Sequence, residues 1–393
     1  MWQNKWVWSI GLVVFLCSIC WAYVFAEVED NEVRFARQMV GRAASERTII
    51  WQSDALDEKT RLAYRQSGDK VVREVRPEVE RCVVGDDTFF RYRVEVDGLV
   101  RGAGYEYRIG GEGSAWHRLR VPAEEYTMLI FSDSQCSGDY RVWQEVVRAA
   151  MEDVPSAELC LHLGDLVDCG ASRYQWERWL TGAEGVLLSC AFAPTLGNHE
   201  DYTTNWRMTI PYWYHALFPV VKNDDAELDG YVYSFDYGDV HYAVLDTQAE
   251  ELSAWKADWV LKQAVWLERD LARSGARWKV VLCHKPFYEM DGTLSEHGKA
   301  WLPICRKYGV RLVLSGHHHI YAHKEIDGIT MITAGVSGDG TGYDVQGDGT
   351  DVVLKRCDMP NWLAMTVTHD AILLRAVQID GIVIDEVMIS SQE

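Results

Sequence analysis

Five short segments of this 393-residue chain carry side chains that can bind metal ions. They supply carboxylate and amide oxygens together with imidazole nitrogens. That mixture suits a pair of divalent or trivalent first-row metal ions, because a calcium site is built from oxygens alone and a structural zinc site is rich in cysteine. The segments are Asp133-Ser134-Gln135, Gly164-Asp165-Leu166-Val167-Asp168, Gly197-Asn198-His199-Glu200, His284 and Gly316-His317-His318-His319.

Each segment directly follows a short apolar run that predicts a buried strand. Because the carboxyl ends of strands in an open α/β sheet converge at one edge, residues far apart in the chain can gather there into one site. The predicted core strands are Met128–Phe131, Leu159–Leu163, Phe192–Leu196, Val240–Leu245, Lys279–Cys283 and Arg311–Leu314.

Helical patterns lie between these strands, which indicates α/β layering. One helix is predicted over Val142–Met151. Another is predicted over Lys262–Arg273, where we take Val265, Leu267 and Leu271 to supply the apolar face.

Both ends of the chain favour β-structure. Strands predicted over Thr48–Gln52, Arg91–Val96 and Tyr105–Ile109, with glycine-rich turns between them, are typical of a β-sandwich without metal ligands. The segments Ala371–Val377 and Gly381–Ile389 predict a closing hairpin.

The N-terminus carries a candidate leader. Lys5 precedes an apolar stretch from Trp6 to Phe25, and the small residue Ala26 follows, so residues 1–26 are interpreted as a signal peptide. The stretch also approaches the length of a bilayer span, so an uncleaved anchor is the alternative. In either case we expect the rest to be exported: periplasmic, extracellular or anchored at the outer face, touching a membrane only through this segment.

Composition limits the partners. The formal net charge of −20 disfavours nucleic acid as a binding partner, so an anionic substrate needs a concentrated local positive charge, which bound metal ions supply. Among the cysteines, Cys160 and Cys283 lie in apolar runs and are expected to be core thiols. Cys136 and Cys169 follow motif carboxylates closely, and a disulfide between these two loops stays open.

Other histidines and an aromatic segment lie outside the motifs. Structural roles are expected for His162, His215, His241 and His369, and His318 is expected to point away from the metals. The segment from Tyr202 to Phe218, with Trp206, Tyr212, Trp213 and Tyr214, is either a substrate lid or a core insert.

The order D-x-Q, G-D-x-x-D, G-N-H-E, V-x-x-H and G-H-x-H resembles the motif series of the metallophosphoesterases. The stretches Tyr233–Gly238 and His284–Tyr288 resemble purple acid phosphatases in particular, and the N-terminal strands look like that family's fibronectin-type-III-like domain. The resemblance covers roughly residues 47–389. It implies an α/β (α+β) four-layer metallophosphoesterase-type β-sandwich flanked by helices at 123–393, preceded by an all-β sandwich domain at 30–122.

The resemblance also implies how the motif residues divide between two metal ions. Asp165 would bridge both ions. One ion would be completed by Asp133 and His319, with Gln135 as a weak neutral ligand. The other would be completed by His284, His317 and the amide oxygen of Asn198.

By the same resemblance, His199 would stay off the metals and face the leaving group, with Glu200 holding its ring, while a metal-bridging hydroxide acts as the nucleophile. The sequence departs from the family in three places. Gln135 stands where other metallophosphoesterases have the histidine of a D-x-H motif. Asp168 replaces the tyrosine whose tyrosinate gives purple acid phosphatases their colour, and Ala322-His323 replaces a Glu-Arg pair, which leaves the substrate contacts on that side open.

We therefore expect an exported binuclear-metal hydrolase that acts on small phosphorylated substrates, above all as a phosphomonoesterase. A phosphodiesterase or nucleotidase on the same centre is the alternative within enzymes, and an inactive surface-binding protein is a third hypothesis. Fe, Mn and Zn all fit the ligands, and the sequence leaves the oligomeric state open.

Overall fold

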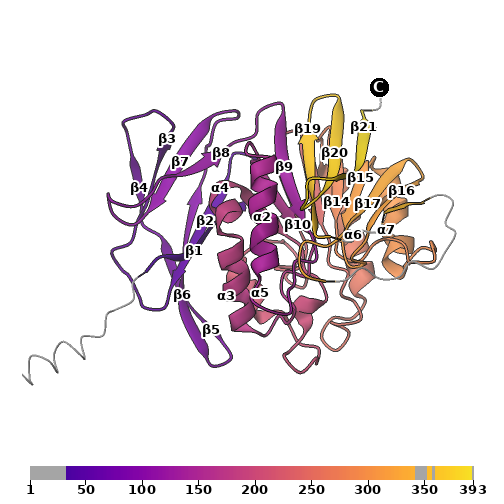
Figure 1. Ribbon diagram of the computed structural model, residues 1–393, viewed down its shortest axis with the longest axis horizontal. Coiled ribbons are helices and arrows are strands. Elements are labelled where there is room, and N and C mark those ends of the chain that lie inside the picture. The colour runs from indigo at the N-terminus through magenta and orange to yellow at the C-terminus, as the bar shows by residue number, and fades with distance from the viewer. Residues whose placement is uncertain (1–31, 341–351, 356–358, 392–393) are drawn as a thin grey trace, which may run out of the picture.

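The computed structural model describes residues 32–340, 352–355 and 359–391 (Figure 1). The leader predicted over 1–26 lies outside this part of the chain. Within the described residues, no helix has both the length and the apolar character needed to cross a membrane.

The N-terminal strands pack as a β-sandwich. One layer is β1-β2-β6-β5, and the other is a four-stranded sheet in the order β4-β3-β7-β8. Between the layers, the indole of Trp51 stacks on the ring of Tyr92 with the centroids 5.4 Å apart. The bounds are β1 Arg34–Val40, β2 Arg47–Ser53, β3 Leu62–Gln66, β4 Arg73–Val75, β5 Glu78–Val84, β6 Asp87–Val96, β7 Gly104–Ile109 and β8 His117–Arg120.

The remaining strands form two large sheets, the first of which also contains β1, β2, β5 and β6 of the sandwich. The first has ten strands in the order β21-β20-β19-β9-β10-β11-β1-β2-β6-β5, and the second has seven in the order β12-β13-β14-β15-β17-β16-β18. The bounds are β9 Tyr126–Phe131, β10 Leu159–His162, β11 Ala191–Pro194, β12 Tyr233–Tyr237, β13 Val240–Val244, β14 Trp278–Leu282, β15 Leu312–Ser315, β16 Tyr321–Ile326, β17 Ile329–Ala334, β18 Val352–Lys355, β19 Asn361–Val367, β20 Ala371–Gln378 and β21 Val383–Ser390.

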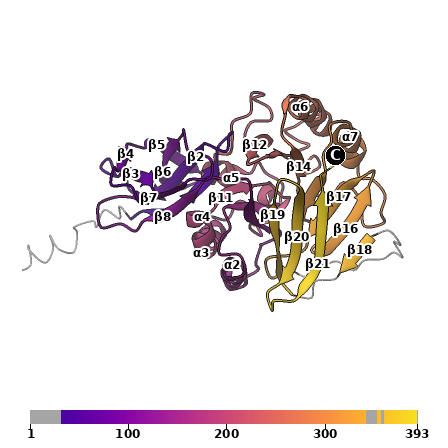
Figure 2. The same ribbon diagram turned by 90° about the horizontal axis from the view of Figure 1, so that it is seen from above.

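Helices cover the outer faces of both sheets, which gives the predicted four layers. Figure 2 shows α2, α3 and α4 beside the first sheet, and α6 and α7 beside the second. The helices are α2 Arg141–Asp153, α3 Arg173–Gly182, α4 Glu184–Ser189, α5 Tyr212–Leu217, α6 Trp259–Arg273 and α7 Glu296–Lys307, with a short 3₁₀ helix η1 at His199–Asp201.

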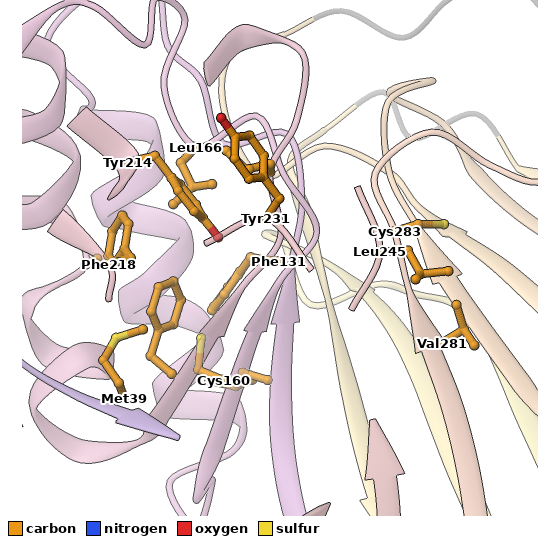
Figure 3. Close-up of a cluster of buried hydrophobic side chains, with 14 of the residues drawn as sticks. Met39, Phe131, Cys160, Leu166, Tyr214, Phe218, Tyr231, Leu245, Val281 and Cys283 are labelled. Carbon is orange, nitrogen blue, oxygen red and sulfur yellow. The ribbon is translucent and has the colours of Figure 1, made fainter. Parts of the chain in front are cut away.

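Each central strand is buried on both faces, as a strand in a four-layer protein must be. In β10, Leu159 and Leu161 belong to the apolar cluster between the two sheets, whereas Cys160 belongs to the cluster beneath the helices. Figure 3 shows part of the second cluster, with Met39 from β1 and Phe218, which follows α5, among its members.

The N-terminal sandwich is joined to the rest through its first strand. β1 pairs in parallel with β11, so the ten-stranded sheet runs through both parts of the chain. Arg37 of β1 is fully buried, and its guanidinium donates hydrogen bonds to the carbonyl oxygens of Leu217 and Phe35. The domain boundary at residue 122 stays a prediction, because one hydrogen-bonded sheet contains strands from both sides of that boundary.

The predicted apolar face of α6 was wrong at one position. Leu267 and Leu271 are buried, but Val265 is 61% exposed. Residues two apart in a helix lie on nearly opposite sides, so Val265 and Leu267 cannot both face the core. Trp259, Val260 and Gln263 complete the buried face instead. The closing hairpin over β20 and β21 forms as predicted.

A histidine joins α6 to the edge of the seven-stranded sheet. Nδ1 of His241 lies 2.7 Å from Oδ1 of Asp236, and its Nε2 lies 2.8 Å from Oδ2 of Asp270. Burial opposes the charged imidazolium, but the two carboxylates outweigh burial and raise the pKa of His241 to about 9.

This pair of contacts predicts a pH-dependent stability. Because the pKa of His241 is higher in the folded protein than its ordinary value of 6.5, its contribution is complete below pH 6.5 and is lost as the pH rises through about 9. We expect the free energy of unfolding to fall by about 2 kcal/mol over that range, allowing for solvent screening at Asp236. Urea unfolding at several pH values measures it. The variant His241→Gln should lack this component, and identical pH profiles for variant and wild type would contradict the assignment.

Candidate active site

The structure brings the predicted motif residues together at one edge of the two sheets. Strands β9, β10 and β11 run parallel in the first sheet, and β13, β14, β15 and β17 run parallel in the second. The motif residues follow the carboxyl ends of five of them: Asp133 and Gln135 after β9, Asp165 after β10, Asn198 and His199 after β11, His284 after β14, and His317 and His319 after β15.

Two groups of potential metal ligands share one carboxylate. The first contains Asp165, His284 and His317, and the second contains Asp133, Asp165 and His319. Within each group the ligand atoms all lie within 4.8 Å of one another. Asp165 is therefore placed where a bridging carboxylate must lie.

The two amide side chains extend these groups. Oδ1 of Asn198 lies 3.1 Å from Nε2 of His284, which places it in the first group. Nε2 of Gln135 lies 3.1 Å from Nε2 of His319, which places its amide in the second. Oε1 of Gln135 is buried and has no hydrogen-bond partner among the described residues, so it is available to bind a metal ion.

The chain leaves room for this cluster by using glycine at two points. A Cβ atom added to Gly197 would lie 2.2 Å from Oδ1 of Asp165, and one added to Gly316 would lie 2.4 Å from Oδ2 of Asp133. Any side chain there would displace a candidate ligand. The residues present thus fit two metal ions, with oxygen and imidazole donors facing one another in a buried cradle.

Four of the candidate ligands adopt a left-handed backbone conformation. Their φ angles are 50° at Asp133, 53° at Asp165, 73° at His317 and 53° at His319. Such angles are uncommon outside glycine and often mark functional sites, because the surrounding structure must hold them. Here the carboxylate of Asp133 accepts the backbone N–H of His317, with both oxygens 3.0 Å from the nitrogen.

Glu200 has a different task from the one predicted. We expected it to hold the ring of His199, but its fully buried carboxylate instead accepts four backbone N–H groups. Oε2 bonds the N–H of Asp165 at 2.9 Å and of Gly197 at 2.8 Å, and Oε1 bonds the N–H of Leu166 at 2.8 Å and of Val167 at 3.2 Å. The side chain thus joins the loops after β10 and β11.

The ring of His199 is held by a backbone carbonyl. Its Nδ1 lies 2.7 Å from the carbonyl oxygen of Asp168, an arrangement in which Nδ1–H donates and Nε2 is directed elsewhere. Nε2 lies 3.9 Å from Oδ2 of Asp165, and the backbone N–H of His199 donates to Oδ1 of Asp165 at 2.8 Å. His199 therefore faces the two groups without belonging to either.

Charge in the site follows from burial and these contacts. Burial opposes ionisation of Asp165, but His284 and His199 outweigh it and hold the pKa of that carboxyl well below its usual range. Burial, reinforced by the charge of His284, lowers the pKa of His317 to about 2. His317 is therefore neutral at pH 7, which is the form of imidazole that can bind a metal ion. Burial opposes protonation of His199 too, yet Asp165 and the Asp168 carbonyl raise its pKa.

The two parts of the aromatic segment lie in different surroundings, and the substrate lid that we left open stays a prediction. Trp213 and Tyr214 of α5 are buried in the core. Trp206 is 58% exposed, and its ring and that of Tyr202 each lie 5.7 Å from the ring of His199. The first part of the segment therefore borders the site, and the second part fills the core.

One loop of the site was not predicted from the sequence. The backbone N–H groups of Ser337 and Gly338, which follow β17, donate to the carbonyl oxygen of Asp133 at 3.2 and 3.0 Å. Asp339 accepts hydrogen bonds from Ser137 next to the first motif. The signal was present in the apolar run Ile329–Ala334 and the glycine after it, but that strand was not predicted.

Among the described residues, the other histidines and the cysteines lie outside the two ligand groups. His162 is fully buried and shares a hydrogen bond of 2.8 Å with Ser134 Oγ, which fits the structural role expected for it. His318 lies in neither ligand group. Cys136 and Cys169 are free, so the disulfide left open between them is not formed, and Cys160 and Cys283 are buried free thiols as predicted.

Comparison with known proteins identifies relatives of this arrangement. Residues 126–321 match the family described as calcineurin-like phosphoesterase. Purple acid phosphatase 18 from Arabidopsis thaliana is 25% identical over 230 residues, which cover 55% of this chain and 49% of that protein. Probable inactive purple acid phosphatase 9 from the same plant is 24% identical over 334 residues, which cover 67% and 49%. The chain spans about half the length of these curated relatives.

Solved structures share the whole architecture. A purple acid phosphatase, PPD1, from seeds of yellow lupin (Lupinus luteus) superimposes with a TM-score of 0.77 at 18% identity, covering 92% of this chain and 74% of that one. The structure of PhoD superimposes with a TM-score of 0.61 at 13% identity, covering 91% and 92%. These matches confirm the predicted fold. The matched family, the shared architecture and the motif order agree, and the chain belongs to the calcineurin-like metallophosphoesterases, as a purple acid phosphatase-like member.

Proposed function

We propose that this protein is a metal-dependent hydrolase of phosphate esters that acts mainly on small phosphomonoesters. The observation that carries the proposal is the pair of ligand groups sharing Asp165, buried at the edge where the strands converge. The proposed metal ligands are Asp133, Gln135, Asp165, Asn198, His284, His317 and His319, and the ions are Fe, Mn or Zn.

When bound, two metal ions would lower the pKa of a coordinated water that serves as the nucleophile and would neutralise charge on the phosphoryl group. The chain supplies the remaining functions. Asp165 holds the two halves of the site together through one carboxylate. His199 keeps Nε2 directed toward the site because Nδ1 is bonded to the Asp168 carbonyl, and it would give a proton to the departing oxygen.

Two alternatives share this site. A phosphodiesterase or nucleotidase would use the same ligands, and an inactive binding protein would need none of them intact.

The purified protein should contain two metal ions per chain by elemental analysis and should cleave monoesters faster than diesters in a panel of both. Faster cleavage of diesters would favour the first alternative. A metal-loaded protein that cleaves nothing would favour the second. Export through residues 1–26 is part of the proposal, and N-terminal sequencing of the secreted protein tests it.

The shared carboxylate predicts the effect of one substitution. We expect Asp165→Asn to lose at least one metal ion per chain and to lower kcat/KM by about 100-fold or more, since even residues that only orient metal ligands are worth 10- to 100-fold. Elemental analysis and steady-state kinetics measure both. The matched control is Asp246→Asn, because Asp246 is 1% exposed and follows β13 at the same edge without belonging to either group. Two ions and normal turnover in Asp165→Asn would refute the bridging role.

The aspartate at position 168 predicts a protein without strong colour. An intense visible band in this family requires a tyrosinate bound to Fe(III), and Asp168 cannot supply one. Loaded with iron under oxidising conditions, the protein should show no intense visible absorption band. If such a band appears, the spectra of Tyr140→Phe and Tyr202→Phe will identify its source, since the hydroxyl oxygen of Tyr140 accepts the backbone N–H of Asp168 and Tyr202 lies beside His199.

The placement of His199 predicts a dependence on the leaving group. His199→Gln should slow hydrolysis of alkyl phosphates by roughly 10²- to 10⁴-fold, the usual range for a lost general acid. Nitrophenyl phosphate should be affected less, because nitrophenolate departs without a proton. The slope of log kcat/KM against leaving-group pKa measures the difference, and metal content should stay at the wild-type level. Equal losses for both classes of ester would show that His199 is not the acid.

A further inference from the structure

A short hairpin beside the site presents one exposed aromatic ring. Tyr202 and Met208 are paired across it, and the N–H groups of Thr203 and Trp206 donate to the carbonyls of Arg207 and Thr203 at 2.9 and 2.8 Å. Thr203 Oγ1 also accepts the N–H of Arg207 at 3.0 Å. The hairpin is thus closed by its own hydrogen bonds, and its geometry does not depend on burial of the ring.

Trp206 is placed in a way that core packing does not explain. Its side chain is 58% exposed, and its φ of 59° lies in the left-handed region, which bulky residues avoid. A strained residue with an exposed apolar side chain costs stability twice, through the backbone and through the solvated indole. A use for the exposed face of the indole accounts for both.

The contacts of Trp206 indicate what that use is. Its ring lies 5.7 Å from the ring of His199 at an interplanar angle of 85°, and 5.8 Å from the ring of Tyr202. If His199 gives its proton to the departing oxygen, as proposed above, the organic group attached to that oxygen lies next to the ring that borders His199. Tyr202 and Trp206 then form the wall against which this group rests.

We infer that Trp206 determines specificity for the alcohol portion of the substrate and that the preferred substrates are phosphate esters with an aromatic ring at or near the ester oxygen. This inference rests on the proposed hydrolase function. A flat aromatic ring can stack on the exposed face of the indole. A saturated ring of the same size is puckered and cannot approach that face as closely. A cationic alcohol is disfavoured because the same hairpin carries the positive charge of Arg207.

The test compares two esters of primary alcohols with rings of equal size, benzyl phosphate and cyclohexylmethyl phosphate. For the full metal-loaded protein we expect kcat/KM to favour the benzyl ester by roughly 5- to 20-fold, the lower part of the range for stacking on one aromatic side chain. Trp206→Leu should bring the ratio near 1, and Trp206→Phe should restore much of it. The matched control is Tyr174→Leu on α3, which removes an aromatic residue that is 56% exposed. It should leave the ratio unchanged.

Binding without turnover gives the same comparison. Calorimetry with benzylphosphonate and cyclohexylmethylphosphonate should show the same preference in wild type and its loss in Trp206→Leu. An unchanged ratio in Trp206→Leu overturns the inference while leaving the hydrolase function intact. A ratio that Trp206→Phe fails to restore also overturns it, since it points to a structural role. Faster hydrolysis of phosphocholine than of benzyl phosphate would overturn it in favour of cation recognition. If the wild-type protein hydrolyses no ester, the proposed function itself fails.

Discussion

The site depends on one buried carboxylate that is not itself a candidate metal ligand. Glu200 accepts hydrogen bonds from the N–H groups of Asp165, Leu166, Val167 and Gly197, so one side chain fixes two loops that leave neighbouring strands. Four N–H dipoles that point at a fully buried carboxylate stabilise its charge, yet burial and the nearby charge of Asp165 raise its pKa to about 7. The two loops therefore act on Glu200 in opposite directions: their N–H groups favour its ionised form, and the charge of Asp165 disfavours it.

The rest of the site follows from those two loops. With the 164–167 loop fixed, Asp165 can adopt its left-handed conformation and accept the N–H of His199. The next residue of that loop, Asp168, presents its carbonyl to the His199 ring. The chain then leaves η1 directly into the hairpin that carries Trp206. The placement of the His199 ring and the placement of the hairpin that carries Trp206 both follow from this arrangement of the backbone, so a change at Glu200 would disturb both.

From the sequence, we predicted which residues gather at the site better than we predicted which groups their side chains contact. Buried strands can be recognised in the sequence as apolar runs. Because residues at the carboxyl ends of such strands converge, Asp133 and His319 could be placed in one site although they lie far apart in the chain. Glu200 shows the limit. Its position beside His199 suggested a contact with the ring, but a fully buried carboxylate binds whichever donors the fold leaves unpaired, and those are backbone groups. Val265 was misplaced for another reason: it is apolar, but its position two residues before Leu267 puts it on the opposite side of the helix.

The buried carboxylates of Asp133 and Asp165 need positive charge close by. In the described residues, the ion-pair partners of Asp133 and Asp165 are histidines: His319 for the first, and His284 and His199 for the second. Histidines compensate buried carboxylates only while protonated, and a protonated histidine cannot bind a metal ion. Two bound divalent or trivalent ions would remove this conflict, because they would neutralise the carboxylates and bind the neutral imidazoles. In a chain with a net charge of −20, metal binding would therefore contribute to the stability of the folded protein as well as to its chemistry.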